Sequence, residues 1–112
     1  MEKKCNSRNI LLGREWFAKG TWYAPQRYLE KTYPSVIKAE YYDTMNSSGD
    51  WEGFFIQKIG VTYYLILFRQ ENNGDGFRFF SSDGWSFKGR SLEAILDAFK
   101  RFLSQYGKVG IR

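Results

Sequence analysis

Histidine is absent from this chain of 112 residues, and cysteine occurs only once, at Cys5. Without imidazole, the chain cannot use a histidine as a catalytic base or as a metal ligand. A single cysteine cannot form an internal disulfide, which excludes the class of small secreted domains that disulfides stabilise. We therefore expect a protein that is not an enzyme and that holds neither a cofactor nor a metal.

Long apolar runs without charge are also missing. No segment reaches the ~18 consecutive apolar residues that are typical of a membrane-spanning helix, and residues 1–16 contain no apolar stretch like that of a signal peptide. The sequence has no G-x-G-x-x-G or Walker pattern for binding a nucleotide phosphate. From Glu71 onward the acids and amides are spaced as in a calcium loop, but Ser82 stands where that loop needs a bidentate acid. The expected location is the cytoplasm, with no membrane attachment.

Aromatic residues, in contrast, are abundant, with 10 Phe, 8 Tyr and 4 Trp. Together with a hydrophobic content of 43%, they predict one folded domain over residues 1–112, of which we expect residues 1–8 to be flexible. The net charge of +5 is uneven: residues 1–34 and 77–112 each carry seven basic and three acidic residues, whereas residues 35–76 carry three basic and six acidic ones. Basic ends suit solubility, and they also suit an acidic protein surface or nucleic acid as a partner.

The stretch Trp51–Arg69 is the longest apolar run, and Gly60 interrupts it once. Alternation on either side of Gly60 predicts two strands, 51–59 and 61–69. Both alternating sets of the second strand are apolar, so both of its faces need cover. One set is Val61, Tyr63, Leu65 and Leu67, and the other is Tyr64, Ile66 and Phe68. The sequence leaves open whether the second of these faces is covered or exposed.

Shorter alternating segments predict the other strands. These strands lie at 35–43, 77–80 and 85–88, with a polar loop at 71–76. In the first of them, Ile37, Ala39 and Tyr41 fall on one face.

Two helices are predicted. Ser91 is a suitable N-cap for a helix over 91–106, whose apolar residues form a single stripe. Pro25 in a first turn favours a second helix over 25–32. Two alternatives stay open for residues 10–23, namely a short helix at 14–19 or a hairpin of 11–17 with 21–24.

The expected fold class is therefore α+β. An antiparallel sheet of four to five strands, within residues 35–89, should carry the C-terminal helix on one face. A partly helical N-terminal segment, residues 9–34, should cover the other face.

Basic and aromatic residues gather on the last predicted strands, and these are the candidate binding residues. They are Tyr64, Arg69, Arg78, Phe80, Trp85, Lys88 and Arg90, to which Trp22 is added from the aromatic N-terminal region. If the strands pair in simple register, Tyr64, Arg78 and Phe80 share one face. Aromatic rings and arginines dominate protein interfaces, and on a sheet they can also stack on bases and contact phosphates. The sequence thus predicts a small binding module that docks on a partner protein, with a single-stranded nucleic-acid-binding domain as the alternative.

Overall fold

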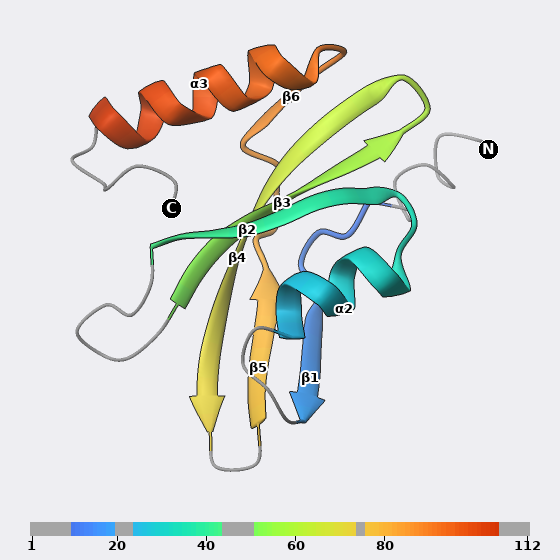
Figure 1. Ribbon diagram of the computed structural model, residues 1–112, viewed down its shortest axis with the longest axis vertical. Coiled ribbons are helices and arrows are strands. Elements are labelled where there is room, and N and C mark those ends of the chain that lie inside the picture. Colours follow the sequence, from blue (N-terminus) through green and yellow to red (C-terminus); the bar gives the residue numbers. More distant parts are fainter. Residues whose placement is uncertain (1–9, 20–23, 44–50, 74–75, 106–112) are drawn as a thin grey trace.

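A computed structural model describes residues 10–19, 24–43, 51–73 and 76–105, which form one antiparallel sheet and two helices (Figure 1). The strands are β1 (Glu15–Lys19), β2 (Val36–Asp43), β3 (Trp51–Ile59), β4 (Thr62–Asn73), β5 (Gly76–Ser81) and β6 (Phe87–Gly89), and the helices are α2 (Ala24–Thr32) and α3 (Leu92–Gln105). The prediction of an α+β fold with an antiparallel sheet and a C-terminal helix is confirmed. The sheet has six strands, where four to five were expected.

Strand β4 is the centre of the sheet. The strands are ordered β1-β5-β4-β3-β2, and β6 pairs with the first part of β4. Between β5 and β6 the chain stays bonded to β4, because the Ser82 amide donates to the Leu67 carbonyl at 2.9 Å and the Ser86 amide donates to the Leu65 carbonyl at 2.8 Å. β5 and β6 thus act as one interrupted strand. Trp85 lies in the interruption, although a strand was predicted to begin there.

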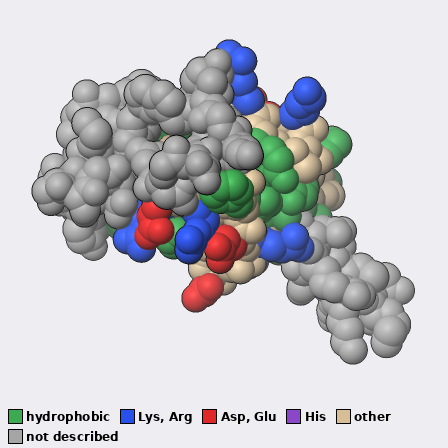
Figure 2. All heavy atoms as spheres, turned by 90° about the horizontal axis from the view of Figure 1, so that it is seen from below, with side chains coloured by type: hydrophobic (Ala, Val, Ile, Leu, Met, Phe, Trp, Pro, Cys, Tyr) green, Lys and Arg blue, Asp and Glu red, His purple; other side chains and the backbone are tan. Residues whose placement is uncertain are grey.

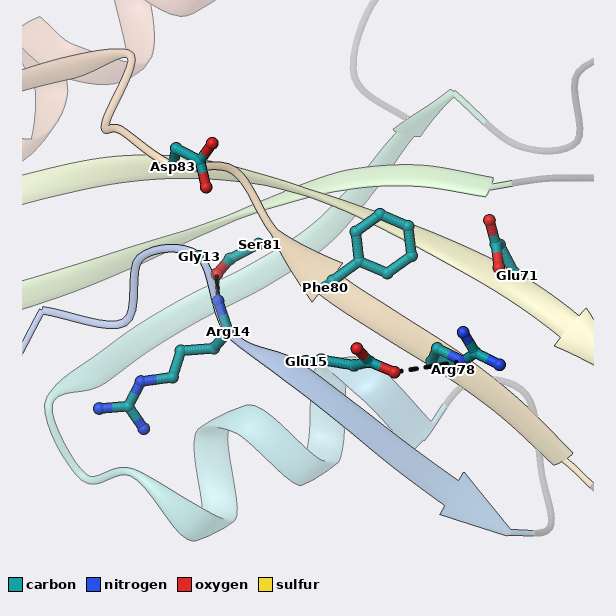
Figure 3. Close-up of a pocket in the computed structure, with 8 residues that line it drawn as sticks. All are labelled: Gly13, Arg14, Glu15, Glu71, Arg78, Phe80, Ser81 and Asp83. Atoms are coloured by element: carbon teal, nitrogen blue, oxygen red, sulfur yellow. Dashed lines mark hydrogen bonds and ion pairs between the residues drawn. The ribbon is translucent and has the colours of Figure 1, made fainter.

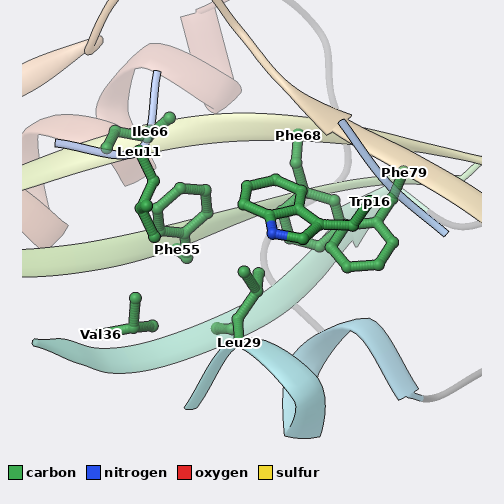
Figure 4. Packing of buried hydrophobic residues seen from close by; sticks show 9 residues of the cluster. Leu11, Trp16, Leu29, Val36, Phe55, Ile66, Phe68 and Phe79 are labelled. Atoms are coloured by element: carbon green, nitrogen blue, oxygen red, sulfur yellow. The ribbon is translucent and has the colours of Figure 1, made fainter. Parts of the chain in front are cut away.

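Both faces of β4 are buried at its centre, in agreement with the double apolar pattern there. Leu65 and Ile66 are neighbours in the chain, yet both are fully buried and belong to different hydrophobic clusters. Ile66 packs in a cluster with Leu11 and Trp16 of the N-terminal segment and Leu29 of α2 (Figure 4). Burying each such large side chain contributes about 1.5–3 kcal/mol. The face of β4 that carries Ile66 is therefore not open to solvent at this point.

Helix α3 is held by a cap at its start and by one apolar stripe. Ser91 Oγ accepts a hydrogen bond from the Ala94 amide at 3.2 Å, which satisfies one of the free N–H groups of the first turn. The buried residues of α3 are Ile95, Phe99 and Leu103. They pack in the cluster of Leu65, on the opposite side of the sheet from α2. The predicted helix at 91–106 is confirmed over Leu92–Gln105.

For residues 10–23, the structure contradicts the predicted short helix and describes only part of the predicted hairpin. Residues 15–19 are strand β1, so the short helix at 14–19 is wrong. Within the described residues β1 pairs with β5, with Trp16 opposite Phe79 and their stacked rings 5.0 Å apart between centroids. Of the proposed hairpin strand 21–24, only Ala24 lies within the described residues, and it begins α2. The helix predicted at 25–32 is confirmed as α2.

Two strand details predicted from alternation are wrong. A register shift between Val36 and Lys38 breaks the alternation in β2, and Ile37 is 42% exposed while Ala39 is buried. β4 continues to Asn73, which pairs with Gly76, so residues 71–73 are strand and not loop. The polar residues there extend β4 because β5 supplies a hydrogen-bonding partner.

Gly53 in β3 lies where neighbouring groups approach closely. A Cβ atom at Gly53 would stand 2.5 Å from the Glu40 carbonyl oxygen and 2.6 Å from Cζ of Phe68. Both distances are shorter than any ordinary carbon contact, so the Phe68 ring packs directly on the glycine backbone.

Two buried glutamines, Gln57 of β3 and Gln70 of β4, bond to the N-terminal segment and to residues of β2 and just before it. Gln57 Oε1 accepts a hydrogen bond from the Leu11 amide at 3.0 Å, and its Nε2 donates to Ser35 Oγ at 2.9 Å. The Tyr41 hydroxyl donates to Gln70 Oε1 at 2.6 Å. Burial raises the pKa of Tyr41 above its ordinary value, because the phenolate would lose its hydration.

Candidate docking surface

The two faces of β4 divide the predicted binding residues. Tyr64 packs against the cluster beneath α2. Arg69 lies an odd number of residues from Tyr64 in β4, so its side chain points to the opposite side of the sheet, the side of α3. Phe80 lies opposite Arg69, and Arg78 shares that side because it is two residues earlier in β5. The prediction that Tyr64, Arg78 and Phe80 share one face is therefore wrong for Tyr64 and right for the other two.

Arg69 and Phe80 form a direct cross-strand pair. The guanidinium carbon of Arg69 lies 5.3 Å from the centroid of the Phe80 ring, a distance within the range of a cation–π contact. Arg69 is exposed and Phe80 is half-buried, so the pair stands at the surface. A contact of this kind contributes about 0.5–1 kcal/mol at an exposed site.

Strand β1 adds two residues to this surface that the sequence prediction missed. Phe17 lies opposite Arg78 in the sheet and is 55% exposed. Glu15 lies opposite Phe80, and its carboxylate is 3.3 Å from Nε of Arg78, an ion pair across the diagonal. These residues could not be assigned before the pairing of β1 with β5 was known. The only local signal is that charged residues flank two adjacent rings in the segment 14–19.

Together these side chains make one surface, which we call the sheet platform. It consists of Glu15, Phe17, Glu52, Arg69, Glu71, Arg78 and Phe80 on the α3 side of β1, β5, β4 and β3. Helix α3 packs on β6 and β4, at the end of the sheet opposite to the one where β4 and β1 finish and β5 begins (Figure 1). The platform thus lies on the part of the α3 side that α3 does not reach.

Two hollows flank the ring of Phe80, each with a volume of about 330 Å³. The first is charged and is lined by Arg14, Glu15, Glu71, Arg78 and Asp83, with Gly13, Phe80 and Ser81 (Figure 3). The second is more apolar and is lined by Tyr42, Leu67 and Phe68, with Glu52, Arg69, Phe80, Ser81 and Ser82. Phe80 therefore lines two depressions of different polarity, which can receive side chains of another molecule.

Charges of both signs surround the rings of the platform. Three carboxylates, those of Glu15, Glu52 and Glu71, alternate with two guanidinium groups, those of Arg69 and Arg78. Glu52 also accepts a hydrogen bond from the Tyr42 hydroxyl at 2.9 Å. Seen from the end where β4 and β1 finish and β5 begins, hydrophobic side chains are exposed among basic and acidic ones (Figure 2). The platform is thus electrically mixed and not uniformly basic.

The remaining predicted residues lie elsewhere. Trp85 is 41% exposed, its ring centroid is 6.1 Å from that of Tyr64, and Nζ of Lys88 is 4.9 Å from it. Tyr64 and Lys88 are opposite each other in β4 and β6. Arg90 is exposed and lines a separate hollow of about 320 Å³ at the start of α3. Trp22 lies outside the described residues.

Within the described ranges, no group of three or more His, Cys, Asp or Glu side chains is placed to hold a metal ion. No helix in that part of the chain is long and apolar enough to cross a membrane. Comparisons with protein-family models, with curated proteins and with solved structures find no match to this chain.

Proposed function

We propose that this protein is a non-enzymatic binding module that docks on a partner protein through the sheet platform. The observation that carries the proposal is the pair of rings, Phe17 and Phe80, held at the surface between side chains of both charges. Exposed rings on a rigid sheet bury a large area while losing little conformational entropy on binding. The two hollows beside Phe80 add shape to which a partner can be complementary.

The mixed charge favours a protein over a nucleic acid as the occupant of the platform. A phosphate backbone is attracted by arginine and repelled by carboxylates. Arg78 is already paired with Glu15, and three carboxylates stand among the platform residues. A protein surface, which also carries both signs, can match such an arrangement residue by residue.

The alternative function, binding of single-stranded nucleic acid, is supported by a different place. Trp85, with Lys88 over its ring and Tyr64 beside it, combines an exposed stacking surface with a positive charge. If this place binds nucleic acid, mixed-sequence single-stranded DNA or RNA should bind at low ionic strength, the affinity should fall with salt, and Trp85→Ala should weaken it. The alternative fails if such oligonucleotides show no salt-dependent binding.

The main proposal is tested with platform variants and a matched control. Immobilised wild type, Phe80→Ala, Arg69→Ala and Val61→Ala are each incubated with an extract of the cells that make the protein, and bound proteins are quantified. Val61 is the control because it is 61% exposed and lies at the turn between β3 and β4, away from the platform. We expect at least one protein that wild type and Val61→Ala retain equally and that Phe80→Ala retains about tenfold less, the effect of losing about 1.4 kcal/mol at a central contact.

If every retained protein binds Phe80→Ala and Arg69→Ala as well as it binds wild type, the platform is not the docking surface. Circular dichroism spectra of all four proteins verify that each variant is folded.

A further inference from the structure

The two edges of the sheet differ in how their backbone groups are satisfied. At the β2 edge, the side chains of α2 bond to both backbone groups of Ala39. Gln26 Nε2 donates to the Ala39 carbonyl at 3.0 Å, and Glu30 Oε2 accepts from the Ala39 amide at 2.9 Å. Helix α2 thereby occupies this edge, and a further strand cannot bond to Ala39.

The β1 edge has no such cover within the described residues. The Ser81 amide donates to the Arg14 carbonyl at 2.9 Å, which fixes the phase of hydrogen bonding between β1 and β5. These bonds alternate along an antiparallel strand. The backbone N–H and C=O groups of Trp16 therefore point toward β5, whereas those of Glu15 and Phe17 point away from it. In the described part of the chain these outward groups have no hydrogen-bonding partner, and β1 is the last strand of the sheet.

We propose that β1 pairs antiparallel with β1 of a second copy of this chain, around a two-fold axis at Phe17. In that register Phe17 lies opposite Phe17 of the second copy, and each donates its outward N–H to the carbonyl of the other. Glu15 then lies opposite residue 19 of the second copy, which is a lysine. Every outward backbone group of β1 is satisfied in this arrangement.

The residue order of β1 favours a second copy over an unrelated strand. The segment reads Glu-Trp-Phe-Ala-Lys. When a second copy runs in the opposite direction, the acidic first residue meets the basic last residue at both ends, and Phe17 meets Phe17 in the middle. Cross-strand pairs of opposite charge and of aromatic rings each stabilise a sheet, whereas charges on an edge strand oppose pairing with a strand that does not complement them. Self-pairing would also join the sheet platforms of two copies, because Phe17 stands at the border of each.

Analytical ultracentrifugation of the full chain alone is the first test. Since a strand of five residues makes a small interface, we expect a reversible equilibrium between a species of 13.2 kDa and one of twice that mass, shifting with concentration. Glu15→Lys should keep the chain monomeric, because it places two positive charges opposite each other. Adding Lys19→Glu to Glu15→Lys should restore the dimer, which a general effect on folding cannot do. An exposed ion pair contributes little to stability, so loss of the Glu15–Arg78 contact leaves the fold intact.

Cysteine cross-linking tests the register. In a Cys5→Ser background, Phe17→Cys should form a disulfide-linked dimer under mild oxidation, since opposite Cα atoms of such a pair are about 5.5 Å apart, within disulfide range. Tyr28→Cys is the control, because Tyr28 is 37% exposed and lies on α2. A monomer at all concentrations, or a dimer that Glu15→Lys leaves unchanged, overturns the proposal. Equal cross-linking at positions 17 and 28 overturns the register. None of these measurements involves the docking partner, so they fail or succeed independently of the proposed function.

Discussion

Replacing Gly53 by alanine should destabilise the sheet at its most crowded point. The added methyl group would lie 2.5 Å from the carbonyl oxygen of Glu40 and 2.6 Å from Cζ of Phe68. The Phe68 ring is 3% exposed and packs in the cluster of Phe55, Ile66 and Phe79, so it cannot move without disturbing that cluster. The Glu40 oxygen belongs to the backbone of β2 and is held by pairing with β3.

Two opposing effects decide how far Gly53→Ala lowers the free energy of unfolding. A glycine-to-alanine change at an unstrained position stabilises a protein by about 0.4–1 kcal/mol, because it restricts the unfolded chain. Overpacking a dense interior costs about 1–3 kcal/mol, and here one of the two clashes is with backbone, which yields least. We expect overpacking to win, with a net loss of about 2 kcal/mol. For a chain of 112 residues this loss corresponds to a fall in Tm of roughly 8–10 °C.

Urea denaturation followed by circular dichroism measures this change. The midpoint should fall while the slope m stays constant, since the surface exposed on unfolding is the same. Gly84→Ala is the matched control, because a Cβ there would meet no atom within 4 Å, and its midpoint should change by less than the equivalent of about 0.5 kcal/mol. A Gly53→Ala protein as stable as the parent would refute the close packing of β2, β3 and β4 described above.

Two further predictions concern hydrogen bonds to side chains. Glu30→Ala removes the acceptor of the Ala39 amide, so the free energy of unfolding should fall by about 1–3 kcal/mol. Hydrogen exchange of that amide, measured by NMR, should accelerate. Unchanged exchange would contradict the role of α2 at this edge. Burial raises the pKa of Tyr41 above its unfolded value of about 10, so its contribution is complete below pH 10 and is lost as the pH rises further. The urea midpoint should therefore show no effect of Tyr41 up to about pH 9 and should fall as the pH is raised from about 10 to about 12, and Tyr41→Phe should reduce this fall; equal alkaline losses in the two proteins would contradict it.

The parts of the fold that follow from local pattern could be predicted from sequence. The stripe of α3 and its serine cap are complete within one segment, and the two apolar sets of β4 already require burial on both faces. Strand β1 could not be predicted in this way, because Trp16 is stabilised by Phe79, which is distant in sequence.

The candidate site was predicted in part for the same reason. Arg69 and Phe80 are both among the candidates that the sequence predicts, but their direct contact depends on the register of β4 and β5, which the predicted loop at 71–76 concealed. Phe17 was missed because its exposure depends on where β1 lies in the sheet. Tyr64, in contrast, could have been separated from Arg69 by counting, since residues an odd number apart in a strand face opposite sides.

Site-specific photo-cross-linking tests the proposed docking surface most directly. A photoreactive phenylalanine analogue is placed at Phe17 or at Phe80 in the full chain, with Val61 as the exposed control position, and the cells that make the protein are irradiated. We predict covalent adducts to the same protein from positions 17 and 80 and none from position 61. Adducts to nucleic acid from positions 17 and 80, or equal protein adducts from all three positions, would contradict the assignment of the sheet platform as the surface that binds a partner protein.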